Sequence, residues 1–271
     1  MATIEEALNR TNDPDVKHIV SLSGGKDSTA LALFMRDNYP QLKVEYVFCD
    51  TGVELPETEE YLERLEARLG TKVTRLDAFA KLKAEKKGKR NAFDMWLQVY
   101  GGYLPSPRSR WCTRVLKIEP FERYVGANTA FSYIGIRYDE NREGYQQQSK
   151  KPPALSDKPN ILPVYPFKEH RMGLRDIERL LEESGLGLPK YYEWRSRSGC
   201  YFCFYQQKGE WQALKRHHPD LFERAKQYER PINGKQFTWV EGRSLEELEK
   251  DPRKYDVKAP EDVDGCAVCH L

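Results

Sequence analysis

The stretch that decides the fold is Ser23-Gly24-Gly25-Lys26-Asp27-Ser28, which lies between an apolar run at 18–22 and a helix-forming run at 29–35. A strand, a glycine turn and a helix N-terminus in that order predict an anion site. Glycines let backbone N–H groups approach phosphate oxygens, and the helix dipole favours negative charge. Lys26 adds a mobile cation, and Ser23 and Ser28 add hydroxyl donors. The Walker A pattern G-x-x-x-x-G-K-[ST] cannot be laid over these residues. They predict a phosphate-binding loop of another kind, with an ordinary glycine turn as the alternative.

The apolar runs along the first half of the chain predict an α/β fold. They lie at 16–23, 43–50, 72–76 and 130–136. Helical patterns at 27–37 and 56–69 separate the first three runs, and strands that alternate with helices form a parallel sheet with right-handed crossovers. We therefore expect a Rossmann-like parallel sheet in a domain at 1–145, followed by an α-rich, cysteine-containing region at 146–271.

Three segments are expected to face one crevice of this sheet. Ligands of such sheets bind at the carboxyl ends of the strands, near the point where the strand order switches. The loop at 23–28 follows the first strand, Cys49-Asp50-Thr51-Gly52 follows the second, and Gly135-Ile136-Arg137 ends a later one.

Composition narrows the class of protein. The chain has 271 residues, 39% of them hydrophobic, and a net charge of +2, which by itself does not argue for a nucleic-acid partner. No run of 18 apolar residues occurs, and residues 1–6 do not have the pattern of a signal peptide. We therefore expect a cytoplasmic protein without a membrane partner.

Five blocks of sequence follow one another in an order that resembles a known family. They are Ser23–Ser28, Asp50-Thr51-Gly52 with Pro56-Glu57-Thr58, Trp111-Cys112-Thr113-Arg114 with Lys117-Ile118-Glu119-Pro120, Gly135-Ile136-Arg137, and Ser198-Gly199-Cys200-Tyr201-Phe202-Cys203. Across most of its length the chain is therefore similar to the phosphoadenylyl-sulfate (PAPS) reductase-like branch of the PP-loop, or adenine nucleotide alpha-hydrolase, proteins. The resemblance implies that residues 23–28, the PP-loop, bind the pyrophosphate of ATP. It also implies that Asp50, Thr51 and Gly52 lie near the adenosine, and that Gly135 and Arg137 hold a phosphate.

Two departures narrow this resemblance. The assimilatory adenylyl-sulfate reductases carry two adjacent cysteines where this chain has Cys112-Thr113. The reductases also end in a glutamate-cysteine-glycine motif, whereas this chain ends Gly265-Cys266-Ala267-Val268-Cys269-His270-Leu271. The single cysteine in W-C-T-x-x-L-K-I-x-P is more similar to the branch of the DNA phosphorothioation sulfurtransferases and related phage or antiviral-defence proteins.

Cysteine spacing predicts a metal centre. Cys200 with Cys203 and Cys266 with Cys269 form two C-x-x-C pairs, which in a reducing compartment indicate metal ligands rather than disulfides. Two assignments compete. In the one that the resemblance favours, Cys112, Cys200 and Cys203 hold a [4Fe–4S] cluster, with Cys266 of the tail or an open iron completing it. In the other, the two C-x-x-C pairs form a tetrahedral zinc site.

The remaining cysteines have other interpretations. If the tail does not ligate, Cys266 or Cys269 is expected to be a mobile, sulfur-carrying thiol, because a thiolate near a chain end is accessible and nucleophilic. Cys49 lies in an apolar strand, where free cysteine behaves as a small hydrophobe.

Basic residues gather at three places: Lys81–Arg90, the set Arg108, Arg110 and Arg114 around Cys112, and the pair Arg195 and Arg197 before Cys200. The first run is either a solvated loop or a polyanion contact. The arginines beside the cysteines are candidates to hold a sulfate, a nucleotide phosphate or a DNA backbone. Aromatic residues interleaved with them either stack on an unpaired base or pack between helices, and packing is the simpler interpretation.

The expected function is ATP-dependent activation of an acceptor oxygen for sulfur insertion. The first acceptor considered is a DNA backbone phosphate, and tRNA or a small molecule stays open. Lys26 would stabilise the departing pyrophosphate, and Mg²⁺ would bridge the phosphate oxygens with Asp27 as a helper. Sulfur would come from a persulfide, for which Cys269 is the candidate, or from the cluster, with a donor such as a cysteine desulfurase. The alternatives are a PAPS or adenylyl-sulfate reductase, and a non-catalytic nucleotide- or nucleic-acid-binding protein with structural zinc.

Overall fold

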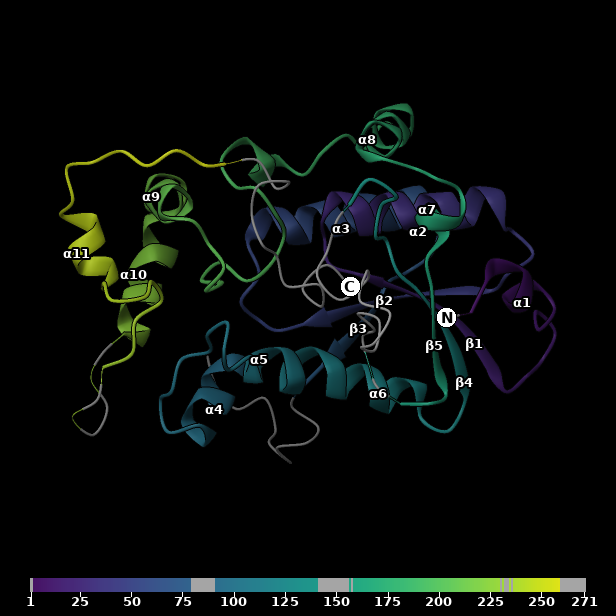
Figure 1. The fold of residues 1–271 in the computed structure, drawn as a ribbon, viewed down its shortest axis with the longest axis horizontal. Coiled ribbons are helices and arrows are strands. Elements are labelled where there is room, and N and C mark those ends of the chain that lie inside the picture. Colours follow the sequence, from purple (N-terminus) through teal and green to yellow (C-terminus); the bar gives the residue numbers. More distant parts are fainter. Residues whose placement is uncertain are drawn as a thin grey trace.

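A five-stranded sheet forms the centre of the protein (Figure 1). The computed structural model describes residues 2–78, 91–140, 156, 158–229, 231, 234 and 236–258. Within them the strands are β1 (Val16–Leu22), β2 (Val44–Asp50), β3 (Thr74–Asp77), β4 (Thr129–Tyr133) and β5 (Ile161–Val164). Their order is β3-β2-β1-β4-β5, and every neighbouring pair is parallel. The α/β class and the Rossmann-like parallel sheet expected from the sequence are confirmed.

The strand order switches beside β1. From β1 the chain proceeds outward through β2 to β3, and it then returns to place β4 on the other side of β1. Val20 of β1 pairs with Tyr46 of β2 and with Tyr133 of β4. Ligands of open parallel sheets bind at such a switch, outside the carboxyl ends of the strands. Here those ends lead into residues 23–28 after β1 and residues 134–137 after β4.

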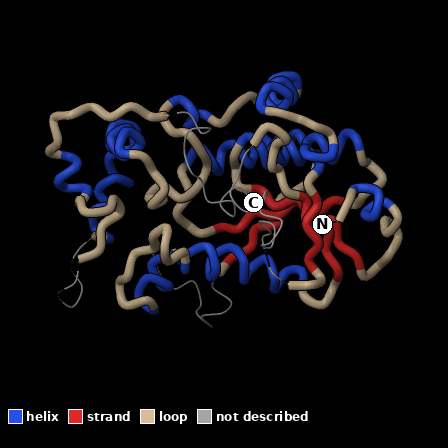
Figure 2. The backbone as a smooth tube through the Cα atoms, in the orientation of Figure 1, coloured by secondary structure: helices blue, strands red, loops and turns tan. Residues whose placement is uncertain are grey.

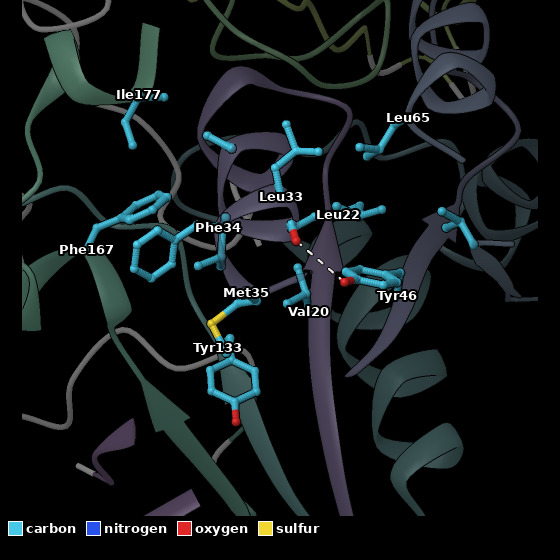
Figure 3. Packing of buried hydrophobic residues seen from close by; sticks show 14 of the residues in the cluster. Val20, Leu22, Leu33, Phe34, Met35, Tyr46, Leu65, Tyr133, Phe167 and Ile177 are labelled. Carbon is cyan, nitrogen blue, oxygen red and sulfur yellow. Dashed lines mark hydrogen bonds between the residues drawn. The ribbon is translucent and has the colours of Figure 1, made fainter. Parts of the chain in front are cut away.

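One face of the sheet is covered by α2 (Lys26–Asn38), α3 (Pro56–Leu69), α7 (Pro166–Glu169) and α8 (Leu174–Glu183), as Figures 1 and 2 show. Ten consecutive residues at the start of α2 are buried because the helix lies between the sheet and α8. Figure 3 shows Leu33, Phe34 and Met35 of α2 packing among side chains of the sheet, α7 and α8.

The opposite face is covered by α6 (Glu119–Val125). This helix follows α5 (Trp111–Thr113) and the wide-turn helix η2 (Arg114–Ile118). Phe121 and Val125 of α6 pack against Ile19, Val47 and Ala130 of the three central strands. Both faces of β1 are therefore covered, which explains why its last five residues, His18–Leu22, are all buried.

A second core joins the part of the chain after residue 190 to α4 (Ala92–Val99) and α5. It includes the short helix η3 (Lys190–Glu193) and the helices α9 (Lys208–His217), α10 (Pro219–Tyr228) and α11 (Leu245–Glu249). Trp211, Trp239 and Phe93 are among its buried aromatic residues. In Figure 1 this group lies at the left, beyond the carboxyl ends of the strands. The short helix α1 (Ile4–Leu8) lies at the opposite end.

The structure differs from the sequence reading at β5. Few strands were expected after residue 145, yet Ile161–Val164 pairs with β4 and completes the sheet. The strand is short, contains Pro163 and occupies the edge of the sheet, which is where proline is tolerated. The division at residue 145 stays a prediction, with one strand of the first domain's sheet contributed from beyond it.

Candidate functional site

The PP-loop connects β1 to α2 by a turn that only glycine can adopt without strain. Gly24 has a φ of +71°, in the left-handed region, and a Cβ added there would lie 2.5 Å from Cγ2 of Thr58. The Ser23 backbone N–H donates to Oγ of Ser28 at 3.1 Å, which closes the loop onto the first turn of α2. Gly25 is the N-cap of α2, so N–H groups at the start of that helix point toward the switch point.

Three charged side chains beside this loop are almost completely removed from water. Lys26, Asp27 and Arg137 are 5%, 6% and 5% exposed. Oδ1 of Asp27 accepts from Nη1 of Arg137 at 2.8 Å, and Oδ2 lies 3.4 Å from Nζ of Lys26. Burial lowers the pKa of the Arg137 guanidinium, but the Asp27 carboxylate outweighs it, so the net shift of that pKa is upward. The PP-loop and the segment after β4 therefore meet as expected, and two cations share one carboxylate.

This arrangement leaves Asp27 poorly suited to the magnesium role expected for it. Both of its carboxylate oxygens face cations, so neither is free for a divalent ion. Gly135 packs closely against the start of α2. A Cβ at this position would lie 3.0 Å from the Asp27 backbone oxygen, so the site requires a residue without a side chain.

The segment Tyr191–Ser198 covers the PP-loop, a contact that the sequence reading missed. The hydroxyl of Tyr191 donates to the Gly24 carbonyl oxygen at 2.7 Å. The Lys26 backbone N–H donates to the hydroxyl of Tyr192 at 3.4 Å, and Nζ of Lys26 lies 5.4 Å from the centre of that ring. Ser198 Oγ is 3.3 Å from Ser23 Oγ. The loop that carries Cys200 therefore begins in direct contact with the phosphate-binding loop.

Asp50 is the last residue of β2, and Thr51 and Gly52 follow it. Gly52 has a φ of +73°, and its backbone N–H donates to Oδ1 of Asp50 at 2.8 Å. Thr51 is fully buried, and its Oγ1 lies 3.5 Å from Sγ of Cys200. The same hydroxyl donates to Glu54, whose pKa is raised by burial. Thr51 therefore contacts the cysteine loop, and Glu54 is a second acidic group at this end of β2 that the motifs did not single out.

Three of the predicted metal ligands line one apolar cavity. The cavity measures about 30 Å³. Its walls include Thr51, Phe93, Cys112, Thr113, Leu116, Lys117, Gly199, Cys200, Phe202, Cys203 and Trp239. Cys112 comes from α5, whereas Cys200 and Cys203 come from the loop after η3, so the fold brings together residues far apart in the sequence. Cys266 and Cys269 lie outside the described residues.

Electrostatics of this cavity favours protonated thiols in the absence of a metal. Burial, followed by the neighbouring thiols of Cys200 and Cys203, raises the pKa of Cys112. Burial, followed by Glu54, raises the pKa of Cys200 to about 11. A bound metal reverses this preference because it binds the thiolate form and releases the proton. Lys117 opposes both shifts by lowering the pKa of each thiol.

The three thiols fit the donor set of an iron–sulfur or zinc centre, because soft thiolates select these metals. Among the described residues, no three His, Cys, Asp or Glu side chains are arranged to hold a single metal ion.

The arginines and aromatic residues near the cysteines divide into buried and exposed groups. Arg108, Arg110 and Arg114 are exposed, whereas Arg195 and Arg197 are buried. Trp96, Trp111, Tyr191 and Trp194 are buried in the second core, which agrees with packing between helices. Tyr100 is 38% exposed and stacks on Trp111 with ring centres 4.6 Å apart. All residues of the basic run Lys81–Arg90 lie outside the described residues.

Cys49 is partly buried, and its thiol donates to the Lys117 carbonyl oxygen, in agreement with a packing role.

The profile of the phosphoadenosine phosphosulfate reductase domain matches residues 17–205, which is well over half of the chain. The chain belongs to this family. The matched span of the PAPS reductase domain runs from the start of β1 to just beyond Cys203, so it contains both the PP-loop and the three clustered cysteines. The family assignment made from the five blocks is confirmed at this level.

Relatives of this PAPS reductase domain protein come from archaea and a phage. An uncharacterized protein of Methanocaldococcus jannaschii is 28% identical over 210 residues, covering 76% of this chain and 40% of the relative. A second protein of that organism is 24% identical, over 75% of this chain and 45% of its own length. The chain thus spans less than half of these two relatives. An uncharacterized 37.8 kDa protein of Escherichia phage 186 is 26% identical, over 79% of this chain and 75% of its own.

Solved structures that are similar to this chain include a reductase and a tRNA thiolase. The PAPS reductase of Candida auris, a phosphate complex, has a TM-score of 0.48 at 14% identity, covering 73% of this chain and 88% of its own. The U34-tRNA thiolase NcsA of Methanococcus maripaludis, with its [4Fe–4S] cluster, has a TM-score of 0.40 at 16% identity, covering 94% and 90%. In the described part of the chain no helix is long and apolar enough to cross a membrane.

Proposed function

We propose that this protein is an ATP-dependent sulfurtransferase that adenylates an oxygen of its acceptor before sulfur replaces it. A backbone phosphate of DNA is the acceptor proposed first. The observation that carries the proposal is the contact between two sites. Ser198 bonds to Ser23 of the PP-loop, and Cys200, two residues later, lines the cavity of three thiols. An anion-binding loop and a thiol centre so close together suit chemistry that joins nucleotide activation to sulfur.

The first chemical step exchanges one phosphorus–oxygen bond for another. The acceptor oxygen attacks the α-phosphorus of ATP, the bond to the β-phosphate oxygen breaks, and pyrophosphate leaves with the electron pair. Lys26 and the N–H groups at the start of α2 face the position where negative charge builds on the departing pyrophosphate. Arg137 supplies a second buried cation, held in place by Asp27. Both cations act in a site from which water is excluded, where electrostatic stabilisation is strongest.

In the second step, sulfur at the oxidation level of sulfide attacks the activated centre, and AMP leaves with the original oxygen. No net oxidation or reduction occurs, so the donor must supply a sulfide equivalent. Cys112, Cys200 and Cys203 would hold a [4Fe–4S] cluster, which would supply an iron without a protein thiolate at which such sulfur can bind. A fourth ligand from Cys266, or a mobile thiol at Cys269, belongs to this proposal.

Product analysis tests the first step. Anaerobically purified protein is incubated with ATP and Mg²⁺, with and without DNA, and the nucleotides are separated by chromatography. We expect AMP and pyrophosphate, formed faster when DNA is present. Conversion of PAPS or adenylyl sulfate to sulfite, with ATP left intact, would instead identify a reductase, the function for which the family is named.

Lys26→Ala is the variant that ties the products to the PP-loop. Losing a donor aimed at developing charge costs about 3 kcal/mol of transition-state stabilisation, so we expect pyrophosphate release to fall by about 100-fold or more. Metal content should not change, because Lys26 does not line the thiol cavity. Lys17→Ala, on β1 and away from the loop, is the control. Unchanged release in Lys26→Ala would remove the PP-loop from the mechanism.

A further inference from the structure

Two nitrogens of the Arg197 guanidinium are buried without a hydrogen-bond acceptor among the described residues. Arg197 is 5% exposed, and within the part of the chain that the structure describes neither Nη1 nor Nη2 has a hydrogen-bond partner or contact with solvent. The guanidinium carbon lies 4.8 Å from the centre of the Tyr205 ring. A cation–π contact offsets only part of the cost of removing an arginine from water. Buried charges in proteins are paired or bind a ligand, so this one calls for an anion.

Arg195 shows what a structural arginine does in the same motif. Its Nη1 donates to the Gly199 carbonyl oxygen at 3.2 Å, and its Nη2 donates to the Cys200 carbonyl oxygen at 2.8 Å. It therefore braces the loop that carries the thiols. Arg197 makes no comparable contact among the described residues, although it is nearly as buried.

Gln206 adds unpaired donors on the other side of the C-x-x-C pair. Its side chain is 7% exposed, and both the oxygen and the nitrogen of its amide lack a partner among the described residues. Its backbone N–H donates to the Cys203 carbonyl oxygen at 2.8 Å, which closes a turn three residues after the second cysteine. It also follows Tyr205, the ring on which the Arg197 guanidinium lies. Amide and guanidinium N–H groups are the donors that hold phosphate oxygens in proteins.

We propose that Arg197, assisted by Gln206, forms a second oxyanion site that binds a phosphate group other than the pyrophosphate on the PP-loop. Arg197 precedes Ser198, which contacts the PP-loop, and lies three residues before Cys200 on the thiol cavity. A phosphate held there lies between the nucleotide and the sulfur chemistry. The phosphate is either a phosphodiester of the acceptor or the α-phosphate of the nucleotide. The role of this phosphate in the reaction rests on the proposed function, whereas the binding of phosphate to Arg197 can be measured without any turnover.

The first test is thermal unfolding of Arg197→Gln in a buffer without phosphate or sulfate. Because the substitution removes an uncompensated buried charge, the ligand-free variant should unfold at the same temperature as the wild type or a higher one. In a Lys26→Ala background, inorganic phosphate should still raise the melting temperature, and adding Arg197→Gln should abolish that rise. A ligand-free melting temperature lowered by about 2–4 °C or more would show a structural role and overturn the proposal.

The second test distinguishes the two sources of phosphate. Binding is measured for α,β-methylene ATP, for a single-stranded DNA oligonucleotide, and for the same oligonucleotide with an uncharged methylphosphonate backbone. Arg197→Gln should weaken the binding of one charged ligand by about tenfold or more, and that ligand identifies the source of the phosphate. An acceptor phosphodiester predicts a loss for the charged oligonucleotide alone. Arg216→Gln removes the same charge from the exposed part of α9 and is the control. Equal affinities of Arg197→Gln and the wild type for all three ligands would refute the site.

Discussion

At the scale of single residues, the site depends on charges held out of water. The sequence placed Asp27 in the PP-loop and Arg137 after a later strand, and both positions agree with the structure. Their ion pair could not be predicted, because it depends on how β1 and β4 lie side by side. The sequence therefore supplied the residue types of the anion site, whereas the packing decides which of them neutralise each other.

Asp27→Asn should destabilise the protein strongly. The substitution leaves Lys26 buried without a counter-charge and removes the buried one of the two carboxylates that bind Arg137, and breaking a buried ion pair typically costs about 3–5 kcal/mol. Urea unfolding measures the loss. Asp139→Asn is the matched control, since that carboxylate also binds Arg137, at 3.1 Å, but is 47% exposed. Asp139→Asn should lower the free energy of unfolding by about 1 kcal/mol or less. Similar losses in the two variants would show that burial does not decide the strength of these pairs.

His18 should make stability depend on pH. Burial lowers the pKa of its imidazole below the ordinary value of 6.5. The unfolded chain therefore binds this proton more readily, and the free energy of unfolding should fall as pH drops through 6.5, by at most about 1.4 kcal/mol per pH unit. Urea unfolding across that range measures the slope. His18→Gln should reduce the slope, and an unchanged slope in that variant would assign the effect to other groups.

At the scale of elements, two features escaped the sequence analysis for different reasons. β5 was missed because a four-residue edge strand containing Pro163 has no clear period-2 pattern. The contact of Tyr191 with the PP-loop was missed because it joins residues distant in the chain and carries no motif. By contrast, α3 was predicted at 56–69 with the bounds that the structure has, since proline and acidic residues in its first turn mark where the helix begins.

Gly24→Ala should disrupt the turn between β1 and α2. The substitution adds both a left-handed backbone penalty and a contact of 2.5 Å with Cγ2 of Thr58. Gly70→Ala is the control, because Gly70 has a φ of +68° but open space around the added Cβ. We expect Gly70→Ala to cost about 1 kcal/mol in urea unfolding and Gly24→Ala to cost more, with loss of ATP binding.

Thr58→Ser removes the methyl group that causes the clash and should partly restore Gly24→Ala. Equal destabilisation by the two glycine substitutions, with ATP binding retained in both, would show that the close approach of α3 to the loop has no role.

At the scale of the whole molecule, the cavity lined by three cysteines joins the sheet domain to the region after residue 190. Cys112 follows α4 and lies in α5, whereas Cys200 and Cys203 come from the later region. From the sequence, a common site for these three cysteines followed only from the family resemblance. The fold places all three on the wall of one cavity. Which cysteines of the tail join them stays a prediction.

Single serine substitutions should separate ligands from bystanders. Cys112→Ser, Cys200→Ser and Cys203→Ser should each lose most of the bound metal in anaerobically purified protein, because all three line one cavity and each would ligate the proposed centre. Cys49→Ser should retain it, since Cys49 packs against α6 and η2 instead. Iron and acid-labile sulfide of about four each per chain would identify a cluster, and about one zinc would identify the tetrahedral site.

The position of β1 in the middle of the sheet has a consequence for how the chain is made. His18 of β1 pairs with Val44 of β2, which is close to it in the chain, but its other neighbour, Phe131 of β4, leaves the ribosome only after the whole of residues 23–130. Until then the central strand exposes one unpaired edge, which is a template for association with other chains. Slow, non-local pairing of this kind limits the folding rate. The nascent protein should therefore aggregate most readily when translation pauses just before β4, and chaperone binding should peak at that length.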